Sequence, residues 1–319
     1  MILVTGASGF IGSQLVPRLV AQREPVRVLV RRRPVAAGAG VERVSGDLVS
    51  GEGIDDALRG VRAVIHLAGT TKALHAREYE EGNVTGAERI AHAAAGRGIR
   101  FVHVSSLAAA GPAAGGVPVA EEDPPHPVGI YGATKLAGER AVRAALPDAV
   151  IVRPAVVYGP GDTDLLQLLR SISKGIVLEI AGGERWFSGI FVDDLVTALL
   201  AAVRTPAAAG RTYNLAHAAP VSWAHLSRLA QRVMAVRART LRVPVPLAFG
   251  VGWGAEQWAR LTGRPSIISR DKVKEAVHHH WTCDVRRAAA ELGFTAPTPI
   301  EEGLPRTLSW YREAGWLRY

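Results

Sequence analysis

Short apolar runs alternate with helical patterns through the first half of the chain. Runs typical of buried strands lie at 2–5, 26–30, 61–67, 99–104 and 149–152. Between them, residues 10–20, 78–95 and 131–146 show the periodicity of amphipathic helices. This alternation predicts an α/β fold, a doubly wound parallel sheet of Rossmann type with helices on both faces. Ligands bind such sheets beyond the carboxyl ends of the strands, where the strand order reverses.

The pattern loosens in the second half. We expect helices at about 164–174, 191–203, 284–292 and 299–314, and a short strand at 213–215. Ser222 is the expected N-cap of a further helix that starts at Trp223. Few other runs there favour strands. The sequence therefore predicts a dinucleotide-binding domain over 1–158 and a smaller, mainly substrate-binding lobe over 159–319, within which the chain returns to the sheet.

The segment 243–261 is the best candidate for a long apolar helix. It contains Glu256 and Arg260, and no run of 18 apolar residues occurs. We interpret it as a buried or pocket-lining helix, in preference to a membrane span or a peripheral membrane contact. Trp223, Trp253 and Trp258 could line an apolar substrate site or belong to the core, and the sequence leaves both open.

Composition narrows the class of protein only slightly. The chain is 48% hydrophobic with a net charge of +9, but its arginines are scattered among acids, which indicates a solvated surface and no nucleic-acid partner. The single cysteine, Cys283, excludes an internal disulfide, and the N-terminus lacks a signal-peptide pattern. We expect a cytoplasmic protein. The triplet His278–His280 has no partners spaced for metal binding, so no metal site is predicted.

A glycine motif between the first strand and the first helix predicts a phosphate-binding loop. Gly6, Gly9 and Gly12 allow a tight turn, close approach of the backbone to a pyrophosphate, and helix–strand packing. The helix N-terminus then directs free N–H groups at the phosphates. Ser8, Phe10 and Ile11 complete the predicted contact set.

The end of the second strand favours NADP(H), with NAD(H) as the alternative. NAD sites commonly place an acid there for the ribose 2′-hydroxyl, but here Arg31, Arg32 and Arg33 follow the strand and no acid occurs before Glu42. A guanidinium pairs with a 2′-phosphate, which a carboxylate would repel. We expect Arg31 and Arg32 to contact that phosphate.

Tyr131 and Lys135 lie four residues apart, on one face of a predicted helix. A cation near a phenol lowers its pKa and brings the group into the acid/base range. Ser105 and Ser106 follow a predicted strand, at the edge where a hydroxyl could orient a substrate oxygen. A tyrosine and a lysine at this spacing are weak evidence of a catalytic site by themselves. Together with the glycine loop and the strand-end serines they are strong evidence.

Together these motifs resemble the extended short-chain dehydrogenases/reductases, also called the NAD-dependent epimerase/dehydratase family, over essentially the whole chain. The motifs that carry the resemblance are 5–12 (TGASGFIG), 46–48 (GDL), 66–69 (HLAG), 83–84 (NV), 104–106 (VSS), 131–135 (YGATK), 153–154 (RP), 158–161 (YGPG) and 192–194 (VDD).

The resemblance implies a role for each motif. Tyr131 would be the general acid/base, and Lys135 would bind the nicotinamide ribose and lower the Tyr131 pKa. Ser106 is favoured over Ser105 as the catalytic hydroxyl, because it lies five residues before Gly111. The remaining cofactor contacts would come from Asp47, Leu48, Leu67, Ala68, Gly69, Pro154 and Val157. Asn83 would shape a helix start, and Asp193 and Asp194 would cap or orient the following helix.

Two activities fit this site. One is reduction of a ketone or oxidation of a secondary alcohol, as in the similar dihydroflavonol reductases and 3β-hydroxysteroid dehydrogenases. The other is redox-neutral 4-epimerisation of a nucleotide sugar with tightly held NAD. A dehydratase is disfavoured, because Leu107 and Ala108 replace the Asp-Glu pair of those relatives. A non-catalytic scaffold is disfavoured because Ser106, Tyr131 and Lys135 are all present.

Two alanine faces predict a homodimer. The residues Ala87, Ala91 and Ala94 on one helix, and Ala133, Ala137 and Ala141 on another, would allow close helix approach. Related enzymes often dimerise through these helices. The alternative for the same residues is ordinary packing on the sheet.

Overall fold

The computed structural model describes residues 1–31, 40–180, 182–263, 266 and 269–319. A seven-stranded parallel sheet dominates it, in the order β11-β6-β5-β4-β1-β2-β3. Its strands are β1 (Ile2–Thr5), β2 (Val26–Val30), β3 (Val41–Ser45), β4 (Ala63–His66), β5 (Arg100–Val104), β6 (Val150–Pro154) and β11 (Thr212–Leu215). The predicted Rossmann-type parallel sheet is confirmed. The strand order reverses between β1 and β4, which places the expected ligand edge there.

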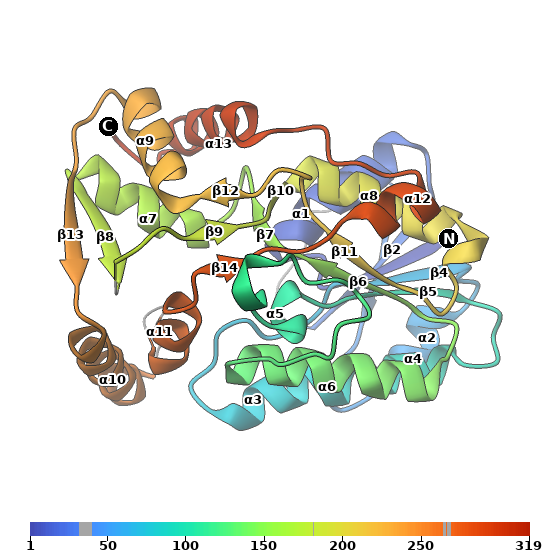
Figure 1. Cartoon of the computed structure of the whole chain (residues 1–319). Helices are drawn as coiled ribbons and strands as arrows, with labels where there is room; N and C mark the ends of the chain where they lie inside the picture. The colour runs from blue at the N-terminus through green and yellow to red at the C-terminus, as the bar shows by residue number, and fades with distance from the viewer. Residues whose placement is uncertain (32–39, 181, 264–265, 267–268) are drawn as a thin grey trace.

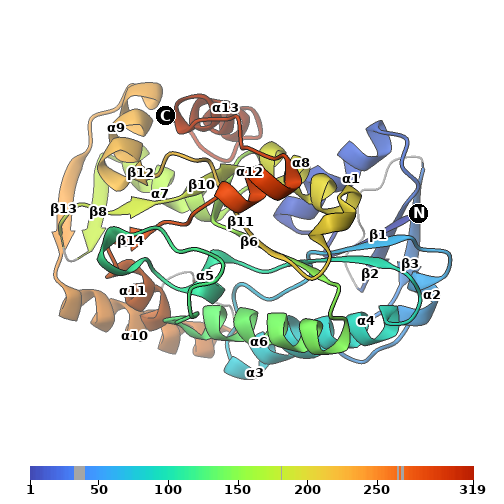
Figure 2. The ribbon, with the colours of Figure 1, turned by 45° about the vertical axis from the view of Figure 1, so that its right-hand side comes forward.

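Helices cover both faces of this sheet (Figures 1 and 2). One layer consists of α1 (Phe10–Ala21), α8 (Val192–Arg204) and α12 (Arg286–Leu292). The other consists of α2 (Ile54–Leu58), α4 (Gly86–Ala94) and α6 (Ile130–Ala145). Leu15, Leu19 and Leu199 on the first layer and Ile90 and Val142 on the second are fully buried. The near-continuous apolar runs of the strands are explained by this two-sided burial.

The predicted helix over 78–95 is divided in the structure. It begins as α3 (Ala76–Glu80), passes through a π-helical turn at Glu81–Thr85, and continues as α4. Asn83 lies buried in that turn. One-turn π segments inside helices are frequent at functional sites, and this one faces the predicted catalytic helix α6.

A second lobe lies beside the sheet, with its own apolar cluster formed by α7 (Asp164–Ser173), α9 (Trp223–Met234) and α13 (Ile300–Glu313). Ser222 caps α9 as predicted, accepting a bond from the His225 N–H at 3.1 Å. Its small sheets pair β7 (Val156–Tyr158) with β10 (Gly189–Phe191), β8 (Ile176–Ile180) with β13 (Arg239–Val243), and β9 (Trp186–Phe187) with β12 (Val221–Ser222) and β14 (His280–Trp281). The remaining helices are α5 (Leu107–Ala110), α10 (Val245–Thr262) and α11 (Arg270–Ala276).

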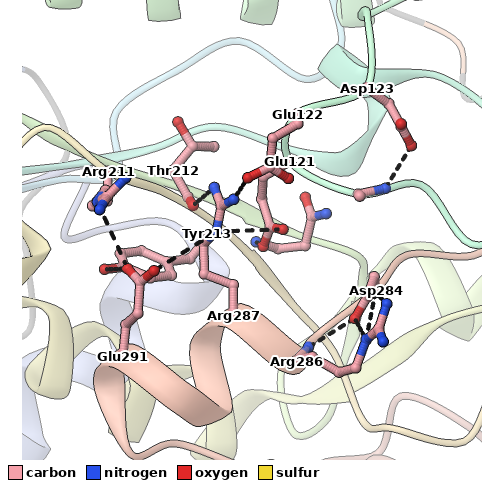
Figure 3. A network of polar contacts seen from close by, with 12 residues as sticks. Glu121, Glu122, Asp123, Arg211, Thr212, Tyr213, Asp284, Arg286, Arg287 and Glu291 are labelled. Atoms are coloured by element: carbon pink, nitrogen blue, oxygen red, sulfur yellow. Dashed lines mark hydrogen bonds and ion pairs between the residues drawn. The ribbon is translucent and has the colours of Figure 1, made fainter.

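A polar network fastens the C-terminal segment to the sheet and to the loop after α5 (Figure 3). Arg287 on α12 pairs with Glu122, and the Tyr213 hydroxyl donates to Glu291 at 2.8 Å. Glu121 accepts the Asn214 N–H at 2.8 Å, and burial raises the pKa of this carboxyl. The loop after α5 is therefore held by both α12 and β11.

Three expectations need correction. The helix expected at 243–261 forms, but its largest apolar side chains are exposed, Trp253 by 54% and Trp258 by 69%, so it is neither buried nor part of the core. Ala87, Ala91 and Ala94 pack inside the second-layer core of this same chain, so they are no dimer face. Asp194 does not cap α8; its carboxylate accepts bonds from the Thr298 N–H and hydroxyl.

Candidate active site

The glycine loop lies between β1 and α1, at the reversal of strand order. Gly6 has a left-handed φ of 70°, and a Cβ there would lie 2.6 Å from the Ala68 nitrogen. A Cβ on Gly12 would lie 2.5 Å from the Gly6 oxygen. The first helix turn has no side-chain cap, since its N-cap is Gly9. Its N–H groups, with exposed Ser8 and Gly9, thus form an open cradle that fits a pyrophosphate.

The loop after β4 forms the opposite side of this cradle. The Ala68 N–H donates to Thr5 Oγ1 at 3.3 Å, which holds 67–69 against the end of β1. A Cβ on Gly69 would lie 2.8 Å from Asn83 Oδ1 and 3.7 Å from the Lys135 ammonium. Only a glycine therefore fits between these two polar groups. Pro154 is the last residue of β6, and Val157 is the middle residue of the short strand β7 that follows it.

The predicted adenosine end of the site lies after β2 and β3. Arg31 follows β2 and lies 3.8 Å from the Asp47 carboxylate, and 65% of its side chain is exposed. Asp47 also accepts the Val49 N–H at 2.7 Å, which orders the turn containing Leu48. Arg31 is thus available to an anionic group beside Asp47. Arg32 and Arg33 lie outside the described residues.

Ser106 and Tyr131 meet at the carboxyl end of β5. Ser106 is the N-cap of α5, where its hydroxyl accepts the Ala108 N–H at 3.2 Å. Tyr131 is in the first turn of α6, beside it. Burial raises the pKa of Tyr131, while a hydrogen bond with Ser106 and the charge of Lys272 lower it. Ser105 is engaged elsewhere: it is buried and donates to Glu139.

Lys135 lies one turn further along α6, with its side chain buried. Its ammonium donates to the Val104 carbonyl at 2.7 Å, at the end of β5. Burial lowers the pKa of Lys135 to about 8, partly opposed by Glu139. Lys135 therefore lies beside Gly69, at the edge where the strand order reverses.

Asn83 links the β4 loop to the catalytic helix. Its amide accepts the Thr70 N–H at 2.8 Å and donates to the Thr70 carbonyl and to Thr134 Oγ1, both at 3.0 Å. Thr134 in turn donates to the Tyr131 carbonyl at 3.0 Å. Asn83 positions the first turn of α6 relative to the loop that contains Gly69.

Sequence reasoning missed the charged and polar groups beneath this edge. Glu139 and Arg153 form a buried ion pair, with Arg153 Nη2 2.7 Å from Glu139 Oε2. His66 and His103 stack below Lys135 with centroids 5.4 Å apart, and burial lowers the pKa of His66 to about 3. The spacing of Glu139, four residues after Lys135, could have indicated a polar stripe on the inner face of α6.

Helix α11 packs beside the start of α6, close to the Tyr131 ring. Asp271 accepts the Ile130 N–H at 3.0 Å, which fixes α11 to the start of α6. The Lys272 ammonium lies 5.9 Å from the centre of the Tyr131 ring. Nothing in the sequence pattern placed α11 here, since no periodic run or motif marks it.

Comparison with known proteins gives a consistent result. Residues 2–216 match the family described as the NAD dependent epimerase/dehydratase family. The chain is 35% identical to a ceramide reductase of Caulobacter vibrioides over 99% of its own length and 96% of the relative. It is 27% identical to a UDP-glucose 4-epimerase of Vibrio cholerae, with 98% and 96% covered. It is 29% identical to a 2-alkyl-3-oxoalkanoate reductase of Shewanella oneidensis, with 95% and 84% covered.

Solved structures extend this result. The chain superposes on MoeE5 in complex with UDP-glucose and NAD with a TM-score of 0.78 and 28% identity. The match covers 98% of this chain and 99% of that one. The chain therefore shares the overall architecture of that structure.

Proposed function

Since the chain belongs to the NAD-dependent epimerase/dehydratase family, the extended short-chain dehydrogenases/reductases, we propose that it reduces a ketone to a secondary alcohol with NADPH. At the coarser level it is an NAD(P)-dependent oxidoreductase or epimerase. Two observations support the proposal. Tyr131 has a hydrogen bond with Ser106 after β5, and the Lys135 ammonium donates to the Val104 carbonyl at the end of β5 and lies beside Gly69.

The glycine loop and the 67–69 segment fit a dinucleotide, with Lys135 as the partner of its nicotinamide ribose. The bound nicotinamide would supply the hydride. Ser106 would donate a hydrogen bond to the ketone oxygen and so hold it near the Tyr131 hydroxyl. Tyr131 would then donate a proton to the oxygen as negative charge develops there, a contribution of roughly 10²–10⁴ in rate for a positioned acid.

Tyr131 can serve as the proton donor of a reduction. Burial raises its pKa, so the phenol keeps its proton at neutral pH. Oxidation of an alcohol, the first half of an epimerisation, instead needs a base. Lys272 and Ser106 oppose the effect of burial and bring the phenol closer to the acid/base range.

Arg31 supports NADPH as the coenzyme. Its guanidinium is largely exposed and close to Asp47, the residue expected near the adenine. A guanidinium there can pair with a 2′-phosphate. Arg31→Ala should raise the KM for NADPH about tenfold or more and leave that for NADH nearly unchanged. Equal losses for both coenzymes would contradict this role.

Two reductase relatives suggest the substrate class. The names of these proteins refer to a ceramide and to an alkyl oxoalkanoate, both with apolar chains. We propose a ketone attached to a long apolar chain as the substrate.

Epimerisation of a nucleotide sugar is the second candidate. It is favoured by the similarity to a UDP-glucose 4-epimerase and to MoeE5 with bound UDP-glucose and NAD. A redox-neutral enzyme retains its nucleotide between turnovers. Protein denatured directly after purification should therefore release little NAD if the reductase proposal holds, and near-stoichiometric NAD if the epimerase does.

The catalytic assignment is tested by Tyr131→Phe. Oxidation of NADPH with a long-chain 3-ketoamide, followed at 340 nm, should fall at least about 100-fold, because only the proton donor is lost. NADPH binding, measured by fluorescence titration, should stay within a factor of two or so, since the ring remains. Unchanged turnover would contradict the role of Tyr131.

A further inference from the structure

Helix α10 has two apolar faces, only one of which is packed. Ala248, Gly252 and Ala259 face the protein and are buried. A Cβ on Gly252 would lie 3.0 Å from the Arg270 nitrogen, so the backbones of α10 and α11 are in close contact there. This inner face accounts for the position of the helix.

The outer face is an apolar stripe open to solvent. Leu247, Val251, Trp258 and Leu261 are exposed by 58%, 50%, 69% and 82%. Their spacing of four, seven and three residues places them in one row along the helix, about a third of a turn around the helix from the buried face. No charged residue occupies this row; its remaining member is Gly254. Large side chains aligned in this way on a solvent face mark an interaction surface.

The stripe continues into a neighbouring exposed sheet. Strand β13 leads through Pro244 directly into α10 and pairs with β8. Leu241 is opposite Leu178 in this pairing, and the two are exposed by 55% and 47%. Elements β8, β13 and α10 lie together at one end of the molecule in both views (Figures 1 and 2). We call the stripe and this sheet face the apolar end.

Positive charge is concentrated in the same part of the chain. Residues 223–276 contain ten arginines and lysines but only three acids, so this sixth of the sequence supplies most of the net charge of +9. Arg239 and Arg260 are exposed next to the apolar end, two residues from Leu241 and one from Leu261. An apolar row with basic residues beside it matches an anionic lipid surface.

We propose that the apolar end is a peripheral membrane-docking surface, with α10 lying in the interface of an anionic leaflet. No helix of the described chain is long and apolar enough to cross a membrane, so α10 would lie on the bilayer. A tryptophan and leucines on one row suit the boundary between headgroups and acyl chains. Arginines beside them would pair with lipid phosphates.

Docking there would bring Tyr131 close to the lipid. Helix α11 packs between α10 and the start of α6, through Gly252 on one side and the Asp271–Ile130 bond on the other. Tyr131 is thus one helix away from the proposed membrane contact. This link between docking and catalysis rests on the proposed function, whereas docking itself does not.

The test is vesicle co-sedimentation of the full chain. Vesicles of phosphatidylglycerol and phosphatidylcholine should bind the protein, and pure phosphatidylcholine should bind it less. The variant Trp258→Gln/Leu261→Gln should lower binding about tenfold or more, because it removes two of the four stripe side chains. Trp253→Gln is the matched control: the same residue type, on the same helix and 54% exposed, but outside the stripe.

Several outcomes would overturn the proposal. One is no binding to either vesicle type, and another is equal loss in the stripe variant and in Trp253→Gln. A shift of the stripe variant from dimer to monomer, without effect on vesicles, would make the apolar end an interface between copies of this chain. NADPH oxidation with a water-soluble ketone, measured in parallel, reports on the proposed function separately, and both variants should retain it.

Discussion

Lys135, Glu139 and Arg153 place three ionisable side chains beneath the ligand edge of the sheet. Glu139 accepts bonds from Arg153 and Ser105, so the buried carboxylate is compensated. Lys135 has a carbonyl partner and remains beside the site. This arrangement engages Ser105 with Glu139, whereas Ser106 has a hydrogen bond with Tyr131. These buried charged groups fix the positions of the side chains around them, and their burial has a cost in the stability of the fold.

That cost can be measured through Lys135. Burial lowers its pKa to about 8, from 10.5 in the unfolded chain, so between these values the unfolded chain binds more protons and stability rises with pH. The free energy of unfolding of the wild type, relative to that of Lys135→Met, should therefore rise by up to about 3 kcal/mol between pH 8 and pH 10.5. Urea unfolding across this range measures it. Exposed Lys174→Met should show no such trend, and a flat difference for Lys135→Met would refute the assignment.

The phenol of Tyr131 has a cation, the Lys272 ammonium, above its ring. Lys272 lowers the Tyr131 pKa through its charge, so Lys272→Met should raise it. The alkaline limb of kcat for ketone reduction should move to higher pH, since the acid form then persists longer. Lys274→Met, on the same helix and paired with Asp271, should leave the limb in place. An unmoved limb in Lys272→Met would exclude this coupling.

At the level of elements, the contact between α6 and the π-helical turn sets the position of α6 relative to the loop that contains Gly69. A Cβ on Gly138 would lie only 2.2 Å from the backbone carbonyl oxygen of Asn83, so Gly138→Ala must displace the π-helical turn. We expect a loss of about 1–3 kcal/mol in unfolding free energy. Gly250→Ala, with no atom within 4 Å of its Cβ, should instead gain about 0.5–1 kcal/mol. Urea titration compares the two; equal effects would show that the contact is unimportant.

Several elements could be predicted because their signals are local. The strands of the main sheet are apolar runs, and the cap at Ser222 is a single residue with its own geometry. The π-helical turn was missed because its sequence is helical throughout, and tertiary packing against Gly138 decides its form. β3 was missed because its residues are largely exposed and polar, so no apolar run marks it.

The predicted site residues gather at one sheet edge, but their environment could not be read from sequence. Glycine spacing indicated the cradle, and the spacing of Tyr131 and Lys135 indicated one helix face. The contact of Tyr131 with Lys272 joins residues 141 positions apart, which no local pattern encodes. Likewise, the exposure of Trp258 depends on which face of α10 meets α11.

At the scale of the whole molecule, the two lobes bring a nucleotide cradle and a basic, apolar end to either side of Tyr131. This arrangement agrees with our proposal of a dinucleotide at one side and a ketone with a long apolar chain at the other. The glycine loop is at the reversal of the strand order, while α10 and α11 belong to the second lobe.

A homodimer remains our proposal for the assembly, now through α6 alone. Ala133 on its outer face is exposed, and Ala137 and Ala141 are half-buried. Ala137→Arg should convert a dimer to a monomer in light scattering, because a large cation blocks close helix approach. Ala314→Arg, at the exposed end of α13, should not. A monomeric wild type at all concentrations would rule the dimer out.

The central claim is net transfer of hydride from NADPH to a ketone, and deuterium transfer tests it most directly. The protein is mixed with a long-chain 3-ketoamide and NADPH deuterated at the transferred position, and the product is examined by mass spectrometry. We predict one deuterium on the new carbinol carbon for each NADPH consumed, and none with Tyr131→Phe. An unlabelled, unreduced ketone, together with interconversion of UDP-glucose and UDP-galactose by the same preparation, would contradict the account.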